Sequence, residues 1–205
     1  MPLIEGEVTI VLAGAWNPAI FTPDWVHQKL FADDDDLVVE VLFGEISGLR
    51  FLSEGVALVV LPGRVQVSPV QNDDESLARA ERVATDLLAA LPETPMQARG
   101  INVVVREPMT EVYAPLFRDP PSIPAADMQT IEARRVGWQF RDGGDQINVQ
   151  AESGPGGVSI AFNFHRSGKN AEVLGASIAG SVRSSILRTR DITRWMGAIP
   201  VEATT

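Results

Sequence analysis

The hydrophobic and polar positions near the start of the chain predict a strand followed by a helix. Residues 6–13 are rich in β-branched side chains, which is typical of a β-strand. Further along, Thr22 can cap a helix that begins at Pro23, where the missing N–H has no hydrogen bond to lose. Asp24 then lies at the positive end of the helix dipole. The pattern predicts a helix from Pro23 to about Phe31.

The remainder of the first half predicts a group of strands and an amphipathic helix. Apolar runs favour strands over residues 37–43, 49–52, 56–61 and 64–68. The pair Pro62-Gly63 suits a type II turn, whose twist fits a tight hairpin poorly, so we expect a slightly longer connection there. Residues 72–75 then open a helix with apolar residues at helical spacing up to Leu91, and Pro92 ends it.

The second half repeats this order of elements. A strand over 100–106 and a short helix over 108–117 are followed by a proline-rich loop. Strands are expected near 130–141, 146–151 and 157–165, and the Gly143-Gly144 pair favours a two-residue hairpin between the first two. A final helix is expected within 171–196, with Gly197 as its end.

This order predicts the α+β class, with helices packed on one face of a mainly antiparallel sheet. Each half, residues 1–95 and 96–205, contains a strand, a helix, three or four antiparallel strands and a helix. We therefore expect two structurally similar halves within one compact globular unit. The order of elements resembles the duplicated arrangement of TATA-box-binding proteins, and this resemblance concerns the fold alone, because a fold does not imply a function.

Composition narrows the classes of function. The absence of Cys excludes disulfides, zinc ribbons, iron–sulfur clusters and thiol nucleophiles. The four aspartates 33–36 lack the ligand spacing and central Gly of an EF-hand, and residues 167–169 lack the upstream Gly of a phosphate-binding loop. We expect neither a metal nor a cofactor. Because the first residues lack the features of a signal peptide and no apolar run approaches about 20 residues, we expect a cytoplasmic protein without membrane contact.

Charge is distributed unevenly between the halves. Residues 1–95 carry 16 acidic and 5 basic side chains, whereas residues 96–205 carry 11 acidic and 12 basic ones. Halves of unlike charge favour association with a protein partner or between copies of the chain. The formal charge of −10 on the whole chain disfavours direct nonspecific binding of nucleic acid, which depends on neutralising phosphates.

The three C-terminal strands alternate between apolar and polar side chains. Val136, Trp138, Phe140, Phe162 and Phe164 belong to the apolar set and should face the core. The opposite face should carry amides, arginines, one hydroxyl and one imidazole: Arg135, Gln139, Arg141, Gln146, Asn148, Gln150, Ser159, Asn163 and His165. Such a face is either solvated, as in many antiparallel sheets, or used to bind a polar partner.

Two further features supply candidate partner-binding residues. Arg183, Arg190 and Arg194 share one face of the final helix, where they either dock on an acidic partner or complement the negative end of the helix dipole. Trp16 lies in an aromatic, proline-containing loop, where it either fills the core or anchors an interface.

His165 is the better of the two histidines as a candidate catalytic base, with Asn163 and Arg166 as its neighbours. A nearby arginine favours the neutral imidazole that a general base requires. The sequence contains no Gly-x-Ser-x-Gly motif, and no carboxylate lies close to His165 along the chain. A hydrolase would therefore need a carboxylate from elsewhere in the fold.

Three segments carry a resemblance to a known group of proteins. The segments WNPAIFTPDW (16–25), LPETP (91–95) with GIN (100–102), and FNFH (162–165) together resemble a family of small uncharacterised bacterial proteins. The resemblance implies a bacterial or phage origin. It transfers no site residues, because no activity is attached to the family.

The leading hypothesis is a non-enzymatic bacterial binding or assembly protein that acts through a protein–protein interface, such as a subunit of a phage-defence or phage-related complex. The first alternative is a small-ligand hydrolase that uses His165. The second alternative is an acidic nucleic-acid mimic or a regulator of a DNA-binding protein, which requires the N-terminal carboxylates to form one stripe.

Overall fold

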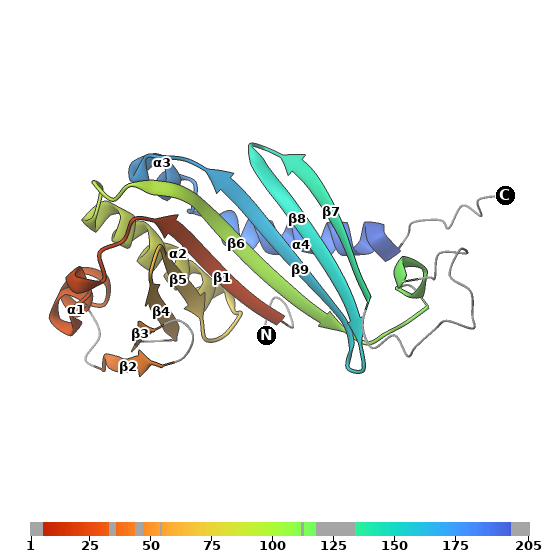
Figure 1. The fold of residues 1–205 in the computed structure, drawn as a ribbon, viewed down its shortest axis with the longest axis horizontal. Helices are drawn as coiled ribbons and strands as arrows, with labels where there is room; N and C mark the ends of the chain where they lie inside the picture. Colours follow the sequence, from red (N-terminus) through yellow and green to blue (C-terminus); the bar gives the residue numbers. More distant parts are fainter. Residues whose placement is uncertain are drawn as a thin grey trace.

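One antiparallel sheet organises the molecule. The computed structural model describes residues 6–32, 36–43, 47–53, 55–111, 113–117 and 134–197. Within these residues, nine strands form a single sheet in the order β2-β3-β4-β5-β1-β6-β9-β8-β7, and neighbouring strands are antiparallel (Figure 1). Together with the α-helices, this is the α+β architecture that the sequence predicts.

The elements follow one another in nearly the predicted order. The first half contributes β1 (Gly6–Gly14), the 3-10 helix η1 (Pro18–Ile20), α1 (Pro23–Leu30), β2 (Val38–Leu42), β3 (Gly48–Ser53), β4 (Val56–Leu61), β5 (Arg64–Pro69) and α2 (Asp74–Ala90). The second half contributes β6 (Met96–Glu107), η2 (Ala114–Phe117), β7 (Arg134–Asp142), β8 (Asp145–Gly154), β9 (Gly157–Ser167), α3 (Ala171–Ala176) and α4 (Ser181–Gly197).

Strands β1 and β6 join the two halves at the centre of the sheet. They pair from Gly6 opposite Val105 to Gly14 opposite Met96, with an irregularity in register after Ala13. Strand β1 also pairs with β5, and β6 also pairs with β9. The two halves of the chain therefore share one continuous sheet.

The core lies on the sheet face that carries the larger apolar side chains. Ile10, Leu12 and Ile101 are fully buried there. Helix α2 contacts β1, β4 and β5, whereas α3 and α4 contact β6; in Figure 1, α2 and α4 run behind the strands. On β9, Phe162 and Phe164 are 1% and 3% exposed, so the inward orientation predicted for these two residues is confirmed.

Capping residues set the helix starts where the sequence predicts them. Thr22 Oγ1 accepts a hydrogen bond of 3.2 Å from the backbone N–H of Trp25, and α1 begins at Pro23. Asp73 Oδ1 accepts a bond of 2.8 Å from the N–H of Ser76 at the start of α2. Both bonds satisfy N–H groups that have no partner within the helix, which is why these short-range signals are reliable.

Two local predictions are wrong. The connection between β4 and β5 is a tight two-residue hairpin, because Leu61 pairs with Arg64 and only Pro62 and Gly63 lie between them. Gly63 takes a φ of +76°, which a glycine adopts without steric cost. The helix predicted over 108–117 is reduced to η2, since Pro115 within it lacks the N–H that a continuous α-helix needs.

The predicted final helix is two helices, α3 and α4. The chain leaves α3 after Ala176, and Gly180 takes a φ of +71° just before α4. The carboxylate of Glu81, on α2, accepts hydrogen bonds from the N–H groups of Gly180 and Val182 over 2.8 and 2.6 Å. This contact between distant parts of the chain stabilises the start of α4.

Some predicted features lie outside the described residues. They are the proline-rich loop with Pro120, Pro121 and Pro124, the aspartates 33–35, and residues 130–133 at the start of a predicted strand. The carboxylate stripe expected of a nucleic-acid mimic depends in part on these aspartates and stays a prediction.

Candidate functional site

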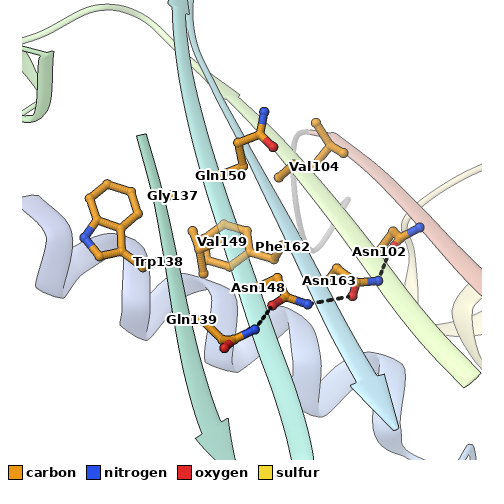
Figure 2. Close-up of a pocket in the computed structure, with 11 residues that line it drawn as sticks. Asn102, Val104, Gly137, Trp138, Gln139, Asn148, Val149, Gln150, Phe162 and Asn163 are labelled. Atoms are coloured by element: carbon orange, nitrogen blue, oxygen red, sulfur yellow. Dashed lines mark hydrogen bonds between the residues drawn. The ribbon is translucent and has the colours of Figure 1, made fainter. Parts of the chain in front are cut away.

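Four carboxamide side chains form a continuous row across four neighbouring strands. In the sheet register, Gln139 (β7) lies opposite Asn148 (β8), Asn148 opposite Asn163 (β9), and Asn163 opposite Asn102 (β6). Each amide donates to the next, over 2.9 Å from Gln139 to Asn148, 3.2 Å from Asn148 to Asn163 and 2.6 Å from Asn163 to Asn102 (Figure 2). We call these four residues the amide row.

The amide row is polarised, because its four carboxamides point the same way. The three NH₂ groups that donate, those of Gln139, Asn148 and Asn163, do so toward β6, and each accepting carbonyl in the row receives its bond from the side of β7. Within the described part of the chain, the carbonyl of Gln139 and the NH₂ group of Asn102 have no hydrogen-bond partner. The row therefore ends in a free acceptor on one side and a free donor on the other.

The polar row continues into the first half of the sheet. Thr9 on β1 lies opposite Asn102, and Ser68 Oγ on β5 lies 3.0 Å from Thr9 Oγ1. Six adjacent strands thus carry hydrogen-bonding side chains at one level of the sheet. Close packing also matters here, since a Cβ at Gly100 would lie only 3.2 Å from Asn163 Nδ2.

The amide row borders a shallow hollow of about 670 Å³. Val104, Gly137 and Ala161 lie one register step from the row and form a floor of small side chains. Gln150 adds a fifth carboxamide (Figure 2). Trp138 contributes to the lining, but its ring lies to the side of β7, away from the row. We call this space the amide hollow.

A second hollow, of about 420 Å³, lies beside the turn between β7 and β8. It is lined by Arg141, Gln146, His165, Ser167 and the turn residues 142–145. Gln146 Nε2 donates to Asn148 Oδ1 over 3.2 Å, so a side chain of this second space is bonded to the amide row. We call it the turn hollow.

An ion cluster supports the turn hollow from the core side. The guanidinium of Arg99, 1% exposed, donates to both carboxylate oxygens of Asp145 over 3.1 Å, and its Nε donates to Ser177 Oγ. Arg166 Nε donates to the same carboxylate over 2.6 Å. Burial lowers the pKa of Arg99 below its ordinary value, and the charge of Asp145 opposes that shift. Asp145 therefore anchors the β7–β8 turn to two arginines.

The structure brings some predicted partner-binding residues together and separates others. Gln139, Asn148 and Asn163 join in the amide row, and His165 lines the neighbouring turn hollow. Arg135 is exposed and pairs with Glu152 over 2.8 Å.

The remaining candidates lie elsewhere. Arg183, Arg190 and Arg194 are exposed on α4; Arg183 pairs with Asp74 over 3.4 Å, and Arg194 lies 3.9 Å from Asp191. Trp16 is 6% exposed and donates its indole N–H to the carbonyl of Leu12 over 2.8 Å. This position fits the first of its two predicted roles, the filling of the core. It does not fit an anchor on the surface.

His165 has a hydroxyl partner rather than an acidic one. Its Nε2 lies 3.0 Å from Ser167 Oγ. Among the described residues, no carboxylate forms a hydrogen bond or an ion pair with His165. Asp145 lines the same hollow, but Arg99 and Arg166 bind its oxygens, and Arg166 is thereby directed at Asp145. The acid–base pair that the hydrolase alternative requires is not formed in this arrangement.

The described part of the chain lacks two further kinds of feature. No group of three or more His, Asp or Glu side chains there is placed to hold a metal ion. No helix there has both the length and the apolar character needed to cross a bilayer.

Comparison with known proteins leaves the site to be interpreted from its geometry. No protein-family model matches the chain, and a search of curated proteins finds no similar sequence. The resemblance of the three segments to a bacterial family therefore stays a prediction.

Sequence reasoning missed Asn102, Arg99 and Asp145. Asn102 had a detectable signal, since it is the one amide of the predicted strand 100–106 and lies between the apolar Ile101 and Val103. Arg99 and Asp145 had none, because a charged residue beside a strand or in a turn is normally assigned to solvent.

Proposed function

We propose that this chain is a non-enzymatic binding protein, a subunit of an assembly, whose protein partner docks on the amide row. The observation that carries the proposal is the row itself: four neutral carboxamides from four adjacent strands, aligned by hydrogen bonds along a hollow of about 670 Å³. A carboxamide has two N–H donors and two acceptor lone pairs. Each row member therefore keeps at least one N–H donor for the C=O groups of a polypeptide, and all but Asn148, whose oxygen already accepts from Gln139 and Gln146, also keep an acceptor for its N–H groups.

The chemistry of this face favours a polypeptide over other ligands. The described residues that share the outward positions of β6–β9 with the amide row include no Trp, Tyr or Phe. The face therefore offers no large ring on which a nucleic-acid base could stack. Amides also carry no charge with which to neutralise phosphates. Hydrogen bonding to a peptide backbone or to polar side chains is an interaction that the amide row supports.

The architecture supports a free recognition face. The sheet places β5, β4 and β3 on one side of the central β1–β6 pair and β9, β8 and β7 on the other. Helix α2 follows the first set, and α3 and α4 follow the second. We infer that the chain consists of two similar halves whose helices cover one face, so that the face with the amide row is left to the partner.

The test compares partner capture by the wild type with capture by a double variant, Asn148→Leu with Asn163→Leu. Both proteins are immobilised and exposed to a lysate of the source organism, and the retained protein is then purified for titration. Replacing two amides leaves polar groups of the partner unpaired, and each costs about 1–3 kcal/mol. The dissociation constant of the double variant should therefore rise at least about tenfold.

The matched control is Gln28→Leu, which converts an exposed amide on α1 to the same apolar residue. It should bind the partner as the wild type does. Urea unfolding of all three proteins shows whether the double variant is folded. Equal affinity of a folded double variant and the wild type would contradict the proposal.

A further inference from the structure

The amide hollow and the turn hollow lie next to each other along the same strands, connected by the Gln146–Asn148 hydrogen bond, and we call the two together the groove. Opposite one another on β7, β8 and β9 lie Arg141, Gln146 and His165, which form one level of the sheet. This level is two residues, or one register step, from the amide row toward the β7–β8 turn. The level of Gly137, Ala161 and Val104 is one step on the other side. Because a strand rises about 3.3 Å per residue, the three levels span about 13 Å along the sheet.

The charged groups at the turn hollow leave one arginine without a carboxylate partner. The lining holds one guanidinium, that of Arg141, and two carboxylates, and both carboxylates are bound by arginines that lie outside the lining. Asp142 pairs with Arg188 over 3.0 Å, and Asp145 is shared by Arg99 and Arg166. Arg141 is exposed and has no ion pair among the described residues.

Three polar side chains complete the lining of the turn hollow. The hydroxyl of Ser167 and the imidazole of His165 lie 3.0 Å apart, and Gln146 extends from the same level of the sheet. An unpaired guanidinium beside such side chains matches a carboxylate, which accepts bidentate hydrogen bonds from arginine. The amide row next to it matches the backbone of the chain that bears that carboxylate.

We propose that the groove binds an extended peptide segment of the partner that carries a small apolar side chain and, about four residues away, a carboxylate. The apolar side chain lies on Val104, Gly137 and Ala161, the backbone bonds the amide row, and the carboxylate lies in the turn hollow beside Arg141. This inference rests on the proposed function and adds the chemistry of the partner. The carboxylate is either an Asp or Glu side chain or a free C-terminus.

Three synthetic peptides test the inference. They are Ac-Val-Ser-Thr-Ser-Asp-NH₂, its neutral Asn counterpart, and Ac-Val-Ser-Thr-Ser-Ser-OH, in which the only charge is the C-terminal carboxylate. Binding is followed by NMR through the side-chain amide signals of Gln146, Asn148 and Asn163 and the imidazole signals of His165. At least one acidic peptide should bind about fivefold or more tightly than the neutral one, and the two acidic peptides distinguish the two sources of the carboxylate.

Two charge variants locate the effect. Arg141→Gln should reduce the affinity of the acidic peptide to that of the neutral peptide. The matched change Arg64→Gln, at an exposed arginine of β5, should leave it unaltered. Equal binding of acidic and neutral peptides, an unaltered affinity in Arg141→Gln, or no shift of any of these signals at about 5 mM peptide would each overturn the inference.

The outcome also separates this inference from the proposed function. If all three peptides shift Asn148 and Asn163 equally, the amide row still binds polypeptide and only the carboxylate requirement is wrong. If the amide-row variant no longer binds the partner captured from the lysate but Arg141→Gln still binds it, the carboxylate requirement is again wrong and the binding role of the amide row stands. The proposed function itself would be wrong if the folded amide-row variant, Asn148→Leu with Asn163→Leu, bound that partner as tightly as the wild type does.

Discussion

The ion pair between the buried Arg99 and the partly buried Asp145 is a single contact whose loss should lower stability. Asp145→Asn keeps the shape of the side chain but leaves the Arg99 guanidinium, 1% exposed, without its counter-charge. Removal of one partner of a buried ion pair typically costs about 3–5 kcal/mol. Arg166 is freed by the same change and is partly exposed, so we expect a loss near the lower end, about 3 kcal/mol, in urea unfolding.

An exposed ion pair on the same sheet provides the control. Glu152→Gln removes the partner of Arg135, where both side chains are in contact with solvent, and should change the free energy of unfolding by less than about 1 kcal/mol. If Asp145→Asn were no more destabilising than Glu152→Gln, the anchoring role of Asp145 at the β7–β8 turn would be wrong.

Single residues also show what the sequence allows one to predict about the site. Gln139, Asn148 and Asn163 were assigned to one face, because alternation along each strand is a local property. Their contact with one another depends on the register between strands, which residues on other strands determine. Arg99 could not be placed inside, because its burial depends on Asp145, 46 residues further along the chain.

Among the elements, α4 depends on a contact from another helix. The Glu81 carboxylate accepts hydrogen bonds from the N–H groups of Gly180 and Val182, which would otherwise lack partners at the helix start. Glu81→Ala should lower the free energy of unfolding by about 2 kcal/mol, the order of hydrogen bonds to a charged acceptor. Glu93→Ala, at an exposed acid after α2, should have little effect.

Hydrogen exchange distinguishes a local effect of Glu81→Ala from a global one. The amides in the first turn of α4 should exchange faster in this variant, whereas those of α1 should change only as much as the global stability does. Unchanged exchange in the first turn of α4 would show that Glu81 does not stabilise this helix start.

The same contact explains why some elements were predictable and others were not. Thr22 and Pro23 define the start of α1 from neighbouring residues, and that prediction is confirmed. The break between α3 and α4 was missed because one of its determinants, Glu81, lies 99 residues from Gly180. The sequence predicts a longer connection at Pro62-Gly63, because a type II turn fits the twist of paired strands poorly. The structure nevertheless forms a two-residue hairpin there.

On the scale of the whole molecule, the two halves are joined by extensive contacts in the sheet and between helices. Strand β1 pairs along its full length with β6, and α2 of the first half contacts α3 and α4 of the second. The pairs Arg183–Asp74 and Glu81–Gly180 also connect the halves. Because this connection runs through the centre of the sheet, we expect the halves to unfold together rather than as separate domains.

Ile101→Ala tests this cooperativity, since Ile101 lies fully buried on the central strand β6. Truncation of a buried isoleucine costs about 2–5 kcal/mol. Hydrogen exchange is measured under conditions where global unfolding dominates, at the most protected amides of β4 and β8, which belong to different halves. If the halves form one cooperative unit, these amides should lose the same amount of protection in Ile101→Ala. Val39→Ala, at a partly exposed position of the edge strand β2, is the mild comparison. Protection that persists in β4 while it falls in β8 would instead show that the first half remains folded when the second half opens.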